Sequence, residues 1–168
     1  MSRNLSRSIF FVVLVFALNA FSFGQAPAAA PPTTPYGMSL NAETAKKAVA
    51  AAIAEARKNN WSMALAVVDT AGYLVYFERM DNTQIGSVQI AVEKAKTAAL
   101  FRRPTKVFQD GLAAGGEGLR FLGLTGAIPV EGGFPIIVEG KIVGAIGASG
   151  GSGDQDSKVA KAGADLIK

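Results

Sequence analysis

The sequence of 168 residues contains neither cysteine nor histidine. Without cysteine the chain cannot form disulfides, thiolate metal sites or cysteine-held iron–sulfur clusters, and thiolate catalysis is excluded. Without histidine it also lacks the commonest general base and the commonest metal ligand. Any ligand must therefore be held by shape, by aromatic contact and by guanidinium or ammonium groups.

The N-terminus has the pattern of a secretory signal peptide. Two arginines and no acid precede an unbroken apolar run over residues 9–18. Small residues at Ser22 and Gly24 fit the −3 and −1 positions of a cut that releases residues 1–24, and a cut after Ala26 is the alternative. The run is shorter than the roughly 20 apolar residues of a membrane-spanning helix, so an uncleaved anchor is the less favoured alternative. We expect an exported protein, either periplasmic or extracellular.

Residues 25–37 are rich in proline and alanine and predict an extended linker. The remaining segment, 38–168, has the usual length of a single domain. Removal of the signal peptide takes away two of the 17 cations, which leaves 15 against 13 acids. A charge so close to balance predicts no nucleic-acid partner, and no membrane span is expected after cleavage.

Periodic patterns predict four helices and five strands in this domain. The helices are expected over 42–59, 86–101, 105–113 and 152–167, and the strands over 62–68, 73–79, 127–130, 134–139 and 141–149. The order is helix, hairpin, two helices, three strands, helix. It favours an α+β domain with one mostly antiparallel sheet.

Two of the helices show a stripe of apolar residues at helical spacing. The expected buried stripe of the first, which Ser39 or Asn41 can cap, is Ala45, Ala48, Val49, Ala52, Ile53 and Ala56. That of the second is Ile85, Val88, Val92, Ala95 and Ala99. In the last helix, Ser152 and Gln155 have the spacing of a capping box.

One compact cationic cluster lies next to aromatic residues. It consists of Arg102, Arg103 and Lys106, with Phe101, Phe108 and, further on, Phe121 nearby. Such a combination can bind the carboxylates of a flat, apolar ligand while the aromatic rings cover its face. The alternative is a helix C-terminus with favourable cations and ordinary core phenylalanines.

Three other patterns allow chemistry but have simpler structural explanations. Glycines between 144 and 153 precede a helix and could hold a phosphate, although two aspartates in the first turn would repel it. Carboxylates at Asp69, Asp81, Glu93, Asp154 and Asp156 could bind a cation or move a proton, or they form turns and caps. Lys96 either forms a solvated ion pair with Glu93 or, if it is buried, acts as a base or a nucleophile.

Residues 38–168 resemble the GlcG/HbpS-like family of small haem-binding proteins, often labelled haem-degrading and related to the PduO C-terminal domain. Five motifs in the same order carry the resemblance, and together they cover nearly the whole predicted domain. They are Ala66–Gly72 (AVVDTAG), Glu78–Asp81 (ERMD), Ala91–Ala98 (AVEKAKTA), Gly132–Pro135 (GGFP), and Val143–Gly150 (VGAIGASG) followed by Asp154–Asp156 (DQD).

The resemblance implies a profilin-like fold, in which a five-stranded antiparallel sheet is flanked by helices. It also implies homo-oligomers, and for secreted members a role in capturing haem or sensing it for an envelope partner. The motif positions it marks are Asp69, Gly72, Arg79, Lys96, Gly133, Pro135, Gly147, Gly150 and Asp156. An axial ligand to haem iron could come only from Tyr36, Tyr73, Tyr76, Met38, Met63, Met80, Thr97 or Thr105, so haem is held weakly, without a strong protein ligand, or not at all.

We therefore expect an exported, non-catalytic protein that binds haem or a related tetrapyrrole. The expected ligand-binding residues are Arg102, Arg103, Lys106, Lys96, Asp69 and Arg79; no catalytic residue or metal ligand is assigned. Two alternatives remain open: an enzyme that acts on a small metabolite with Lys96 or Asp69 as acid–base group, and a self-assembling accessory module of an envelope sensor.

Overall fold

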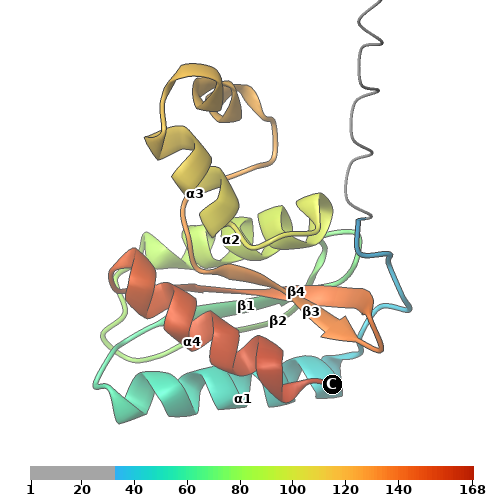
Figure 1. Ribbon diagram of the computed structural model, residues 1–168. Helices are drawn as coiled ribbons and strands as arrows, with labels where there is room; N and C mark the ends of the chain where they lie inside the picture. The colour runs from blue at the N-terminus through green and yellow to red at the C-terminus, as the bar shows by residue number, and fades with distance from the viewer. Residues whose placement is uncertain (1–32) are drawn as a thin grey trace, which may run out of the picture. The chain divides into compact units, whose positions relative to one another are not determined.

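The computed structural model describes residues 33–168, so the predicted signal peptide over 1–24 and the linker as far as residue 32 lie outside the described residues. The elements follow one another as drawn in Figure 1. They are α1 (Ala42–Lys58), β1 (Ala64–Val68), β2 (Leu74–Arg79), α2 (Ser87–Phe101), α3 (Lys106–Ala113), the 3-10 helix η1 (Gly116–Gly123), β3 (Gly133–Val138), β4 (Lys141–Ser149) and α4 (Gly153–Leu166).

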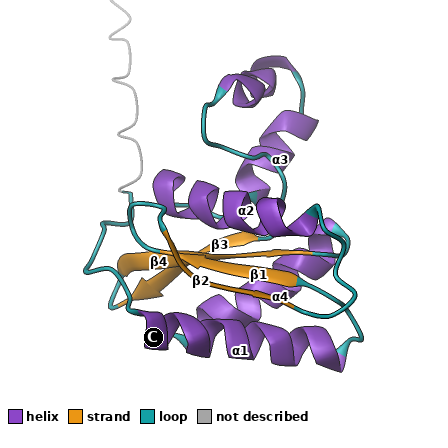
Figure 2. Ribbon diagram, turned by 180° about the vertical axis from the view of Figure 1, so that it is seen from behind, coloured by secondary structure: helices purple, strands orange, loops and turns teal. Residues whose placement is uncertain are grey.

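The four strands form one antiparallel sheet in the order β2-β1-β4-β3. Helices α1 and α4 pack together and cover one face, whereas α2 covers the other (Figure 2). The central strand β1 is buried along its whole length, as its apolar sequence predicts. The predicted α+β class with an antiparallel sheet is confirmed.

The expected fifth strand is absent from the described residues, so the prediction of five strands is wrong. Residues 127–130 run as irregular chain between η1 and β3. The N–H of Ile128 donates to the hydroxyl of Thr97 at 2.9 Å, and Pro129 has no N–H to donate. The N–H of Ile128 is bonded to α2 and Pro129 has none, so these two consecutive residues cannot donate the hydrogen bonds that would pair the segment with a neighbouring strand.

Helix α1 matches its prediction residue by residue. All six residues of the expected stripe are buried, and Asn41 rather than Ser39 caps the helix by accepting a hydrogen bond from the N–H of Thr44 at 2.9 Å. The capping box of α4 is also present, with Ser152 and Gln155 bonded reciprocally. Local side-chain chemistry determines these helix starts, which is why the sequence predicts them.

Helix α2 buries the expected stripe only in part: Ala95 and Ala99 are buried, Val88 and Val92 are half-buried, and Ile85 lies in solvent. Ile85 is 81% exposed, and the residues that face the sheet are small, among them Ala91, Ala95 and Ala98. A Cβ atom added to Gly147 would lie 2.1 Å from the carbonyl oxygen of Ala91, so helix and strand meet backbone to backbone. Large apolar side chains do not fit into this contact, and they lie at its sides instead.

The segment before α1 is part of the sheet. The N–H of Ile142 donates to the carbonyl of Pro35 at 2.9 Å, and the N–H of Gly37 donates back to Ile142 at 2.8 Å. The hydroxyl of Tyr36 donates to the carbonyl of Ala99, at 2.8 Å. The domain therefore includes the last residues of the segment whose composition predicts a linker. Within the described part of the chain, no helix is long and apolar enough to cross a bilayer.

Helix α3 confirms the short helix predicted over 105–113, and η1 folds back on it. We call these two helices and their connection, residues 106–123, the arm. A Cβ atom on Gly118 would lie 1.8 Å from the carbonyl oxygen of Gly111, so the two helices touch at their backbones. The arm stands away from the sheet beyond α2 (Figures 1 and 2).

Candidate functional site

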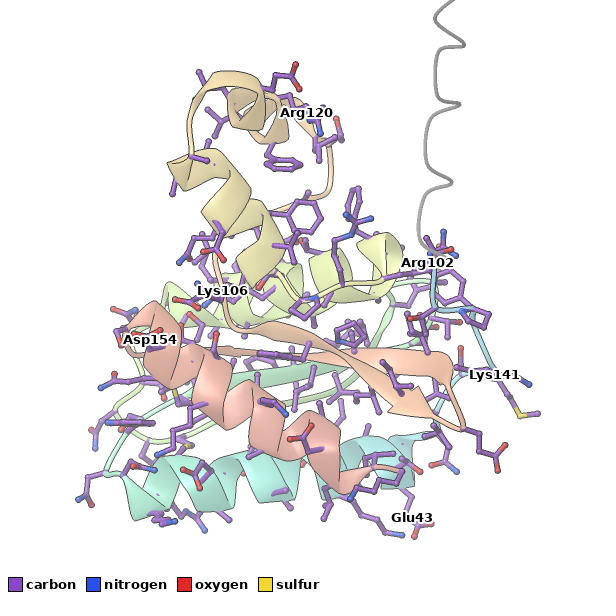
Figure 3. All side chains as sticks on the ribbon, in the orientation of Figure 1. Glu43, Arg102, Lys106, Arg120, Lys141 and Asp154 are labelled. Carbon is purple, nitrogen blue, oxygen red and sulfur yellow. The ribbon has the colours of Figure 1, made fainter. Side chains whose placement is uncertain are left out.

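The three cations of the predicted cluster point to different partners. Arg102 ends α2 in the left-handed conformation, and its guanidinium lies 5.4 Å from the centre of the Tyr36 ring. Lys106 lies 2.7 Å from a carboxylate oxygen of Asp110 on the next turn of α3. Figure 3 shows Arg102 and Lys106 well apart. The cluster of the sequence is thus divided by the turn at the end of α2.

Three phenylalanines form a ladder between α2 and the arm. The ring centres of Phe101 and Phe108 are 5.3 Å apart and those of Phe108 and Phe121 are 5.4 Å apart, both pairs edge to face. The guanidinium of Arg103 lies 5.9 Å from the Phe108 ring centre, and that of Arg120 lies 5.6 Å from the Phe121 ring centre. We call these five residues the aromatic–guanidinium face.

Exposed apolar side chains occur on the same three helices as this face. Leu100, Val107, Leu119 and Leu122 are 45%, 44%, 55% and 68% exposed, respectively. Arg120 has only a loose contact with Glu117, at 3.8 Å, and both side chains are largely in solvent. Phe108 is buried, at 2% exposed, whereas Phe101 and Phe121 are half-buried. The face therefore offers a ligand the accessible parts of these two outer rings, aliphatic surface and two guanidiniums. The sequence interpretation missed Arg120, although its position next to Phe121 repeats the Arg103–Phe108 combination.

The other three predicted ligand residues lie elsewhere. One carboxylate oxygen of Asp69 accepts hydrogen bonds from the N–H groups of Ala71 and Tyr73, at 2.9 and 2.8 Å, which closes the β1–β2 turn. Lys96 is 39% exposed and lies 3.4 Å from Glu93, which is the solvated pair of the simpler interpretation. Arg79 ends β2, in a separate hollow. Of the six predicted residues, the structure places only Arg103 against the ladder.

The buried lysine of α2 is Lys94, and not Lys96. Its ammonium lies 2.6 Å from Asp156 of α4 and donates to the carbonyl of Ala148 at 3.1 Å, with the two side chains 0% and 5% exposed. The second carboxylate oxygen of Asp156 accepts from the N–H of Gly151 at 2.9 Å. Burial raises the pKa of Asp156 above its ordinary value, while the ammonium of Lys94 opposes that rise. In the sequence, Lys94 follows Ala91 by three residues and precedes Ala98 by four, a helical spacing that places all three on one face and could have indicated its burial.

A second buried carboxylate connects the arm to α4. Glu131 accepts hydrogen bonds from the amide of Gln109 at 3.1 Å and from the hydroxyl of Ser157 at 3.2 Å. The ammonium of Lys106 lies 3.9 Å away. The hydroxyl of Thr105 also accepts from the N–H of Gly133, at 2.9 Å. These contacts fix the base of the arm, and sequence reasoning did not identify Glu131 or Gln109.

The glycines of the sequence motifs are packing positions. Added Cβ atoms at Gly133 and Gly150 would lie 2.3 Å from the carbonyl oxygen of Lys94 and 2.2 Å from that of Ser62. The N–H groups at the start of α4 are bonded by Ser152 and accompanied by two aspartates. This arrangement agrees with the structural interpretation of the glycine series and not with a phosphate site.

Most of the candidate axial ligands to haem iron are buried or already hydrogen-bonded within the domain. Met63 is fully buried in the core, and the hydroxyl of Tyr76 donates to Glu78 at 3.1 Å. The hydroxyls of Thr97 and Thr105 are used within the domain. Met38 and Tyr73 are exposed, at 90% and 74%. Among residues 33–168 there is no group of three acidic side chains that could hold a metal ion.

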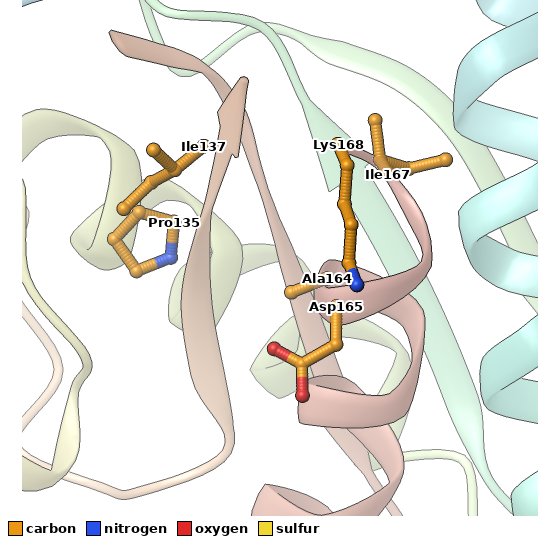
Figure 4. A pocket seen from close by; sticks show the side chains of 6 residues that line it. All are labelled: Pro135, Ile137, Ala164, Asp165, Ile167 and Lys168. Atoms are coloured by element: carbon orange, nitrogen blue, oxygen red, sulfur yellow. The ribbon is translucent and has the colours of Figure 1, made fainter. Parts of the chain in front are cut away.

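A hollow of about 400 Å³ lies between β3 and the end of α4 (Figure 4). It is lined by Pro135, Ile137, Ala164, Asp165, Ile167 and Lys168. It contains the motif residue Pro135 but none of the six predicted ligand residues, and no aromatic ring lines it. Of these two places, the aromatic–guanidinium face is the one whose side chains fit a planar acid.

Known proteins match this chain over most of its length. A family model described as haem degrading protein HbpS-like matches residues 40–165. Protein GlcG of Escherichia coli K12 is 41% identical over 110 residues, which are 66% of this chain and 81% of GlcG.

Solved structures have the same fold. A double mutant of HbpS from Streptomyces reticuli, 32% identical, superimposes with a TM-score of 0.72 over 84% of this chain and 99% of that chain. A PduOC–haem complex, 24% identical, gives a TM-score of 0.70 over 78% and 96% of the two chains, a likeness that shows the fold alone.

Proposed function

The chain belongs to the HbpS-like family of haem-degrading proteins, and from this membership we propose that it binds haem or a related tetrapyrrole. The proposal gains support from the PduOC structure, which has the same fold and is a complex with haem. The single observation that carries it is the aromatic–guanidinium face. A tetrapyrrole of this kind is a flat apolar ring with acidic side groups, which suits rings flanked by cations.

Arg103 and Arg120 are the proposed partners of the ligand's carboxylates. Their guanidiniums lie over the Phe108 and Phe121 rings, at 5.9 and 5.6 Å from the ring centres, and neither is held in a tight ion pair. A guanidinium that is stacked on a ring still presents its N–H donors at its edge, where a carboxylate can bind in bidentate fashion. Arg102, stacked on Tyr36, lies next to Arg103 in sequence and is a further candidate.

The residues of the chain fit the ring and its acids better than they fit the iron. No imidazole or thiolate exists anywhere in the sequence, and the aromatic–guanidinium face contains no tyrosine or methionine. Binding is therefore proposed to rest on ring contact and charge pairing, without a strong axial ligand. When bound, haem would supply its characteristic absorption and the redox chemistry of its iron, whereas the chain would supply orientation and partial exclusion of water.

Titration with haemin tests the proposal. The chain as recovered from the expressing cell should give a saturable shift of the Soret band. Arg103→Gln and Arg120→Gln should each weaken binding by about three- to tenfold, since a charge-assisted hydrogen bond at a partly exposed site contributes roughly 1 kcal/mol. Lys161→Gln, an exposed cation on α4 paired with Asp165, is the matched control and should change nothing.

Two outcomes of the titration would overturn the proposal. A spectrum that never saturates removes haem as a ligand, and equal affinity of the arginine variants and the wild type removes the face as its site. The family description also includes degradation. Under reductant and air, the Soret band should persist if the protein is a carrier, and its bleaching with release of iron would indicate turnover instead.

Export is the second part of the proposal. Its support is the sequence of residues 1–24, with two arginines before an apolar run, together with a family match that begins only at residue 40. Fractionation of cells that express the full chain, followed by mass measurement, should find a product shortened by 24 residues outside the cytoplasm. An intact chain in the cytoplasmic fraction would contradict export.

Assembly of the arm into a homo-oligomer is the third part. Leu119 and Leu122 are more than half exposed on η1. Large apolar side chains exposed together on one short helix are typical of a surface that another protein covers. Light scattering should find a defined oligomer for the wild type and a smaller species for a Leu119→Gln/Leu122→Gln double variant. A monomeric wild type would refute assembly.

A further inference from the structure

A hollow of about 370 Å³ lies where the C-terminus of α1 meets the end of β2. It is lined by two arginines, two acids and one thioether, namely Arg57, Glu78, Arg79, Met80 and Asp81. We call it the Arg57–Arg79 hollow. The proposed tetrapyrrole site does not include it, because the aromatic–guanidinium face is built from α2, α3 and η1.

Three of the four charged side chains in this hollow have no polar partner in the described residues, whereas Glu78 accepts a hydrogen bond from the hydroxyl of Tyr76 at 3.1 Å. Within residues 33–168, neither arginine has an ion pair or a side-chain hydrogen bond, and the same holds for Asp81. Glu55, the acid of α1 nearest to Arg57, is already held by Lys158 at 3.1 Å and by Asn59 at 2.9 Å. Both arginines therefore remain available to an external anion.

Regular elements hold the two arginines in place. Arg57 lies in the last turn of α1, where the helix dipole favours a cation and Asn59 caps the chain. Arg79 pairs with Ala64 at the end of the β1–β2 ladder, and the next residue continues the ladder through a hydrogen bond from Met80 N–H to the carbonyl of Met63, at 2.9 Å. A left-handed residue, Asn82, then turns the chain and leaves Asp81 at the rim.

We propose that the Arg57–Arg79 hollow binds a small zwitterion, such as an α-amino acid. Two guanidiniums suit a carboxylate, which they bind through paired N–H donors. The carboxylates of Glu78 and Asp81 suit an ammonium group, and Met80 offers an adaptable apolar contact for the carbon skeleton. Equal numbers of the two charges select a ligand that is neutral overall but charged at both ends. The volume corresponds to the lower range of small-molecule sites.

Three small probes distinguish this proposal from simple anion binding. L-alanine carries both charges, propionate only the carboxylate, and ethylamine only the ammonium. Calorimetry with the full chain should give a dissociation constant in the millimolar range or below for L-alanine, and binding at least about tenfold weaker for either analogue. Equal binding of propionate and L-alanine would overturn the proposal, and so would the absence of L-alanine binding.

Variants locate the site and separate the two charges. Arg57→Gln and Arg79→Gln should each weaken L-alanine binding by about tenfold. Asp81→Asn should weaken L-alanine binding but leave propionate binding unchanged or stronger, because it removes the partner of the ammonium alone. Lys58→Gln, the neighbouring exposed cation that does not line the hollow, is the control and should bind L-alanine as the wild type does.

The failure of this proposal can be told apart from failure of haem binding. Arg57→Gln should titrate with haemin as the wild type does, since it lies outside the aromatic–guanidinium face. Both arginines are exposed, so their variants should melt at the wild-type temperature. If Arg57→Gln melts normally and still binds L-alanine at wild-type affinity, the hollow is not the site and the proposal is wrong.

Discussion

The ammonium of Lys94 and the carboxylate of Asp156 lie 2.6 Å apart in the core, and they join α2 to the first turn of α4 across the end of the sheet. The pair has further hydrogen bonds to Ala148 and Gly151. Both charges are buried away from water, so each is stable in the folded protein only while the opposite charge is present.

Lys94→Met should lower the free energy of unfolding by about 3–5 kcal/mol, because it leaves a buried carboxylate without its partner. Urea denaturation measures this loss. Lys96→Met is the matched control on the same helix, and its effect should stay below about 1 kcal/mol, since Lys96 is 39% exposed and its pair with Glu93 is solvated. Equal losses in the two variants would contradict the role assigned to Lys94.

The double variant Lys94→Met/Asp156→Leu should be more stable than Lys94→Met alone. Removing both charges leaves no uncompensated ion, and apolar replacements of a buried pair are often neutral or stabilising. The interaction energy from the double-mutant cycle measures this coupling. Additive losses would show that the two side chains contribute independently.

The pH dependence of stability should also reveal Asp156. Burial raises its pKa in the folded state above the value of 3.8 expected in the unfolded chain. The folded state therefore binds this proton more tightly, so the contribution of Asp156 is fully present below the unfolded pKa and is lost as the pH rises through the folded pKa. Relative to Asp156→Asn, the wild type should gain stability as the pH falls from neutral into that window. Urea unfolding of both proteins at several pH values measures the difference, and a constant difference would contradict the raised pKa.

Gly147→Ala should destabilise the fold by about 1–3 kcal/mol or more, since the new methyl group would lie 2.1 Å from the carbonyl oxygen of Ala91. Gly86→Ala is the matched control. Gly86 has a helical backbone conformation, with φ −59°, and no atom within 4 Å of an added Cβ, so its substitution should be neutral or stabilising by up to about 1 kcal/mol. Thermal unfolding distinguishes the two, and a neutral Gly147→Ala would contradict the close packing of α2.

Gly118→Ala should loosen the arm selectively. The new methyl group would collide with the carbonyl oxygen of Gly111, which also belongs to the arm, and no atom of the sheet is among its nearest neighbours. Hydrogen exchange should accelerate over residues 106–123 and stay unchanged over β1, because local opening does not require global unfolding. Haemin affinity should fall by about tenfold if Phe121 leaves the ladder. Exchange that accelerates uniformly over the chain would indicate that the arm is not an independent unit.

The sequence predicted those elements whose cause is local. Helix α1 has one broad apolar stripe, and its six expected positions are all buried. Asn41 and the Ser152–Gln155 box start their helices through side chains a few residues away. The hairpin turn closes on Asp69, and the family resemblance is confirmed. In each case the residues that determine the structure lie within one helical turn or one sequence motif of each other.

The sequence did not predict features that depend on distant backbone. The burial of Lys94 requires Asp156, 62 residues further on, and the small face of α2 follows from glycines of β3 and β4. Residues 127–130 have the composition of a strand, but the hydroxyl of Thr97 takes the N–H of Ile128. The three cations of the cluster are separated because Arg102 adopts the left-handed conformation and turns the chain. Their closeness in the sequence gives no sign of this turn.

The backbone contact of α2 with Gly133 and Gly147 limits how this domain can vary. An enlarged side chain elsewhere in a core can be offset by a smaller neighbour, but the atoms in the way here are peptide carbonyls, which every amino acid carries. No compensating substitution exists at such a contact. Redesign of ligand preference can instead proceed on the arm, whose exposed side chains can change without disturbing that contact.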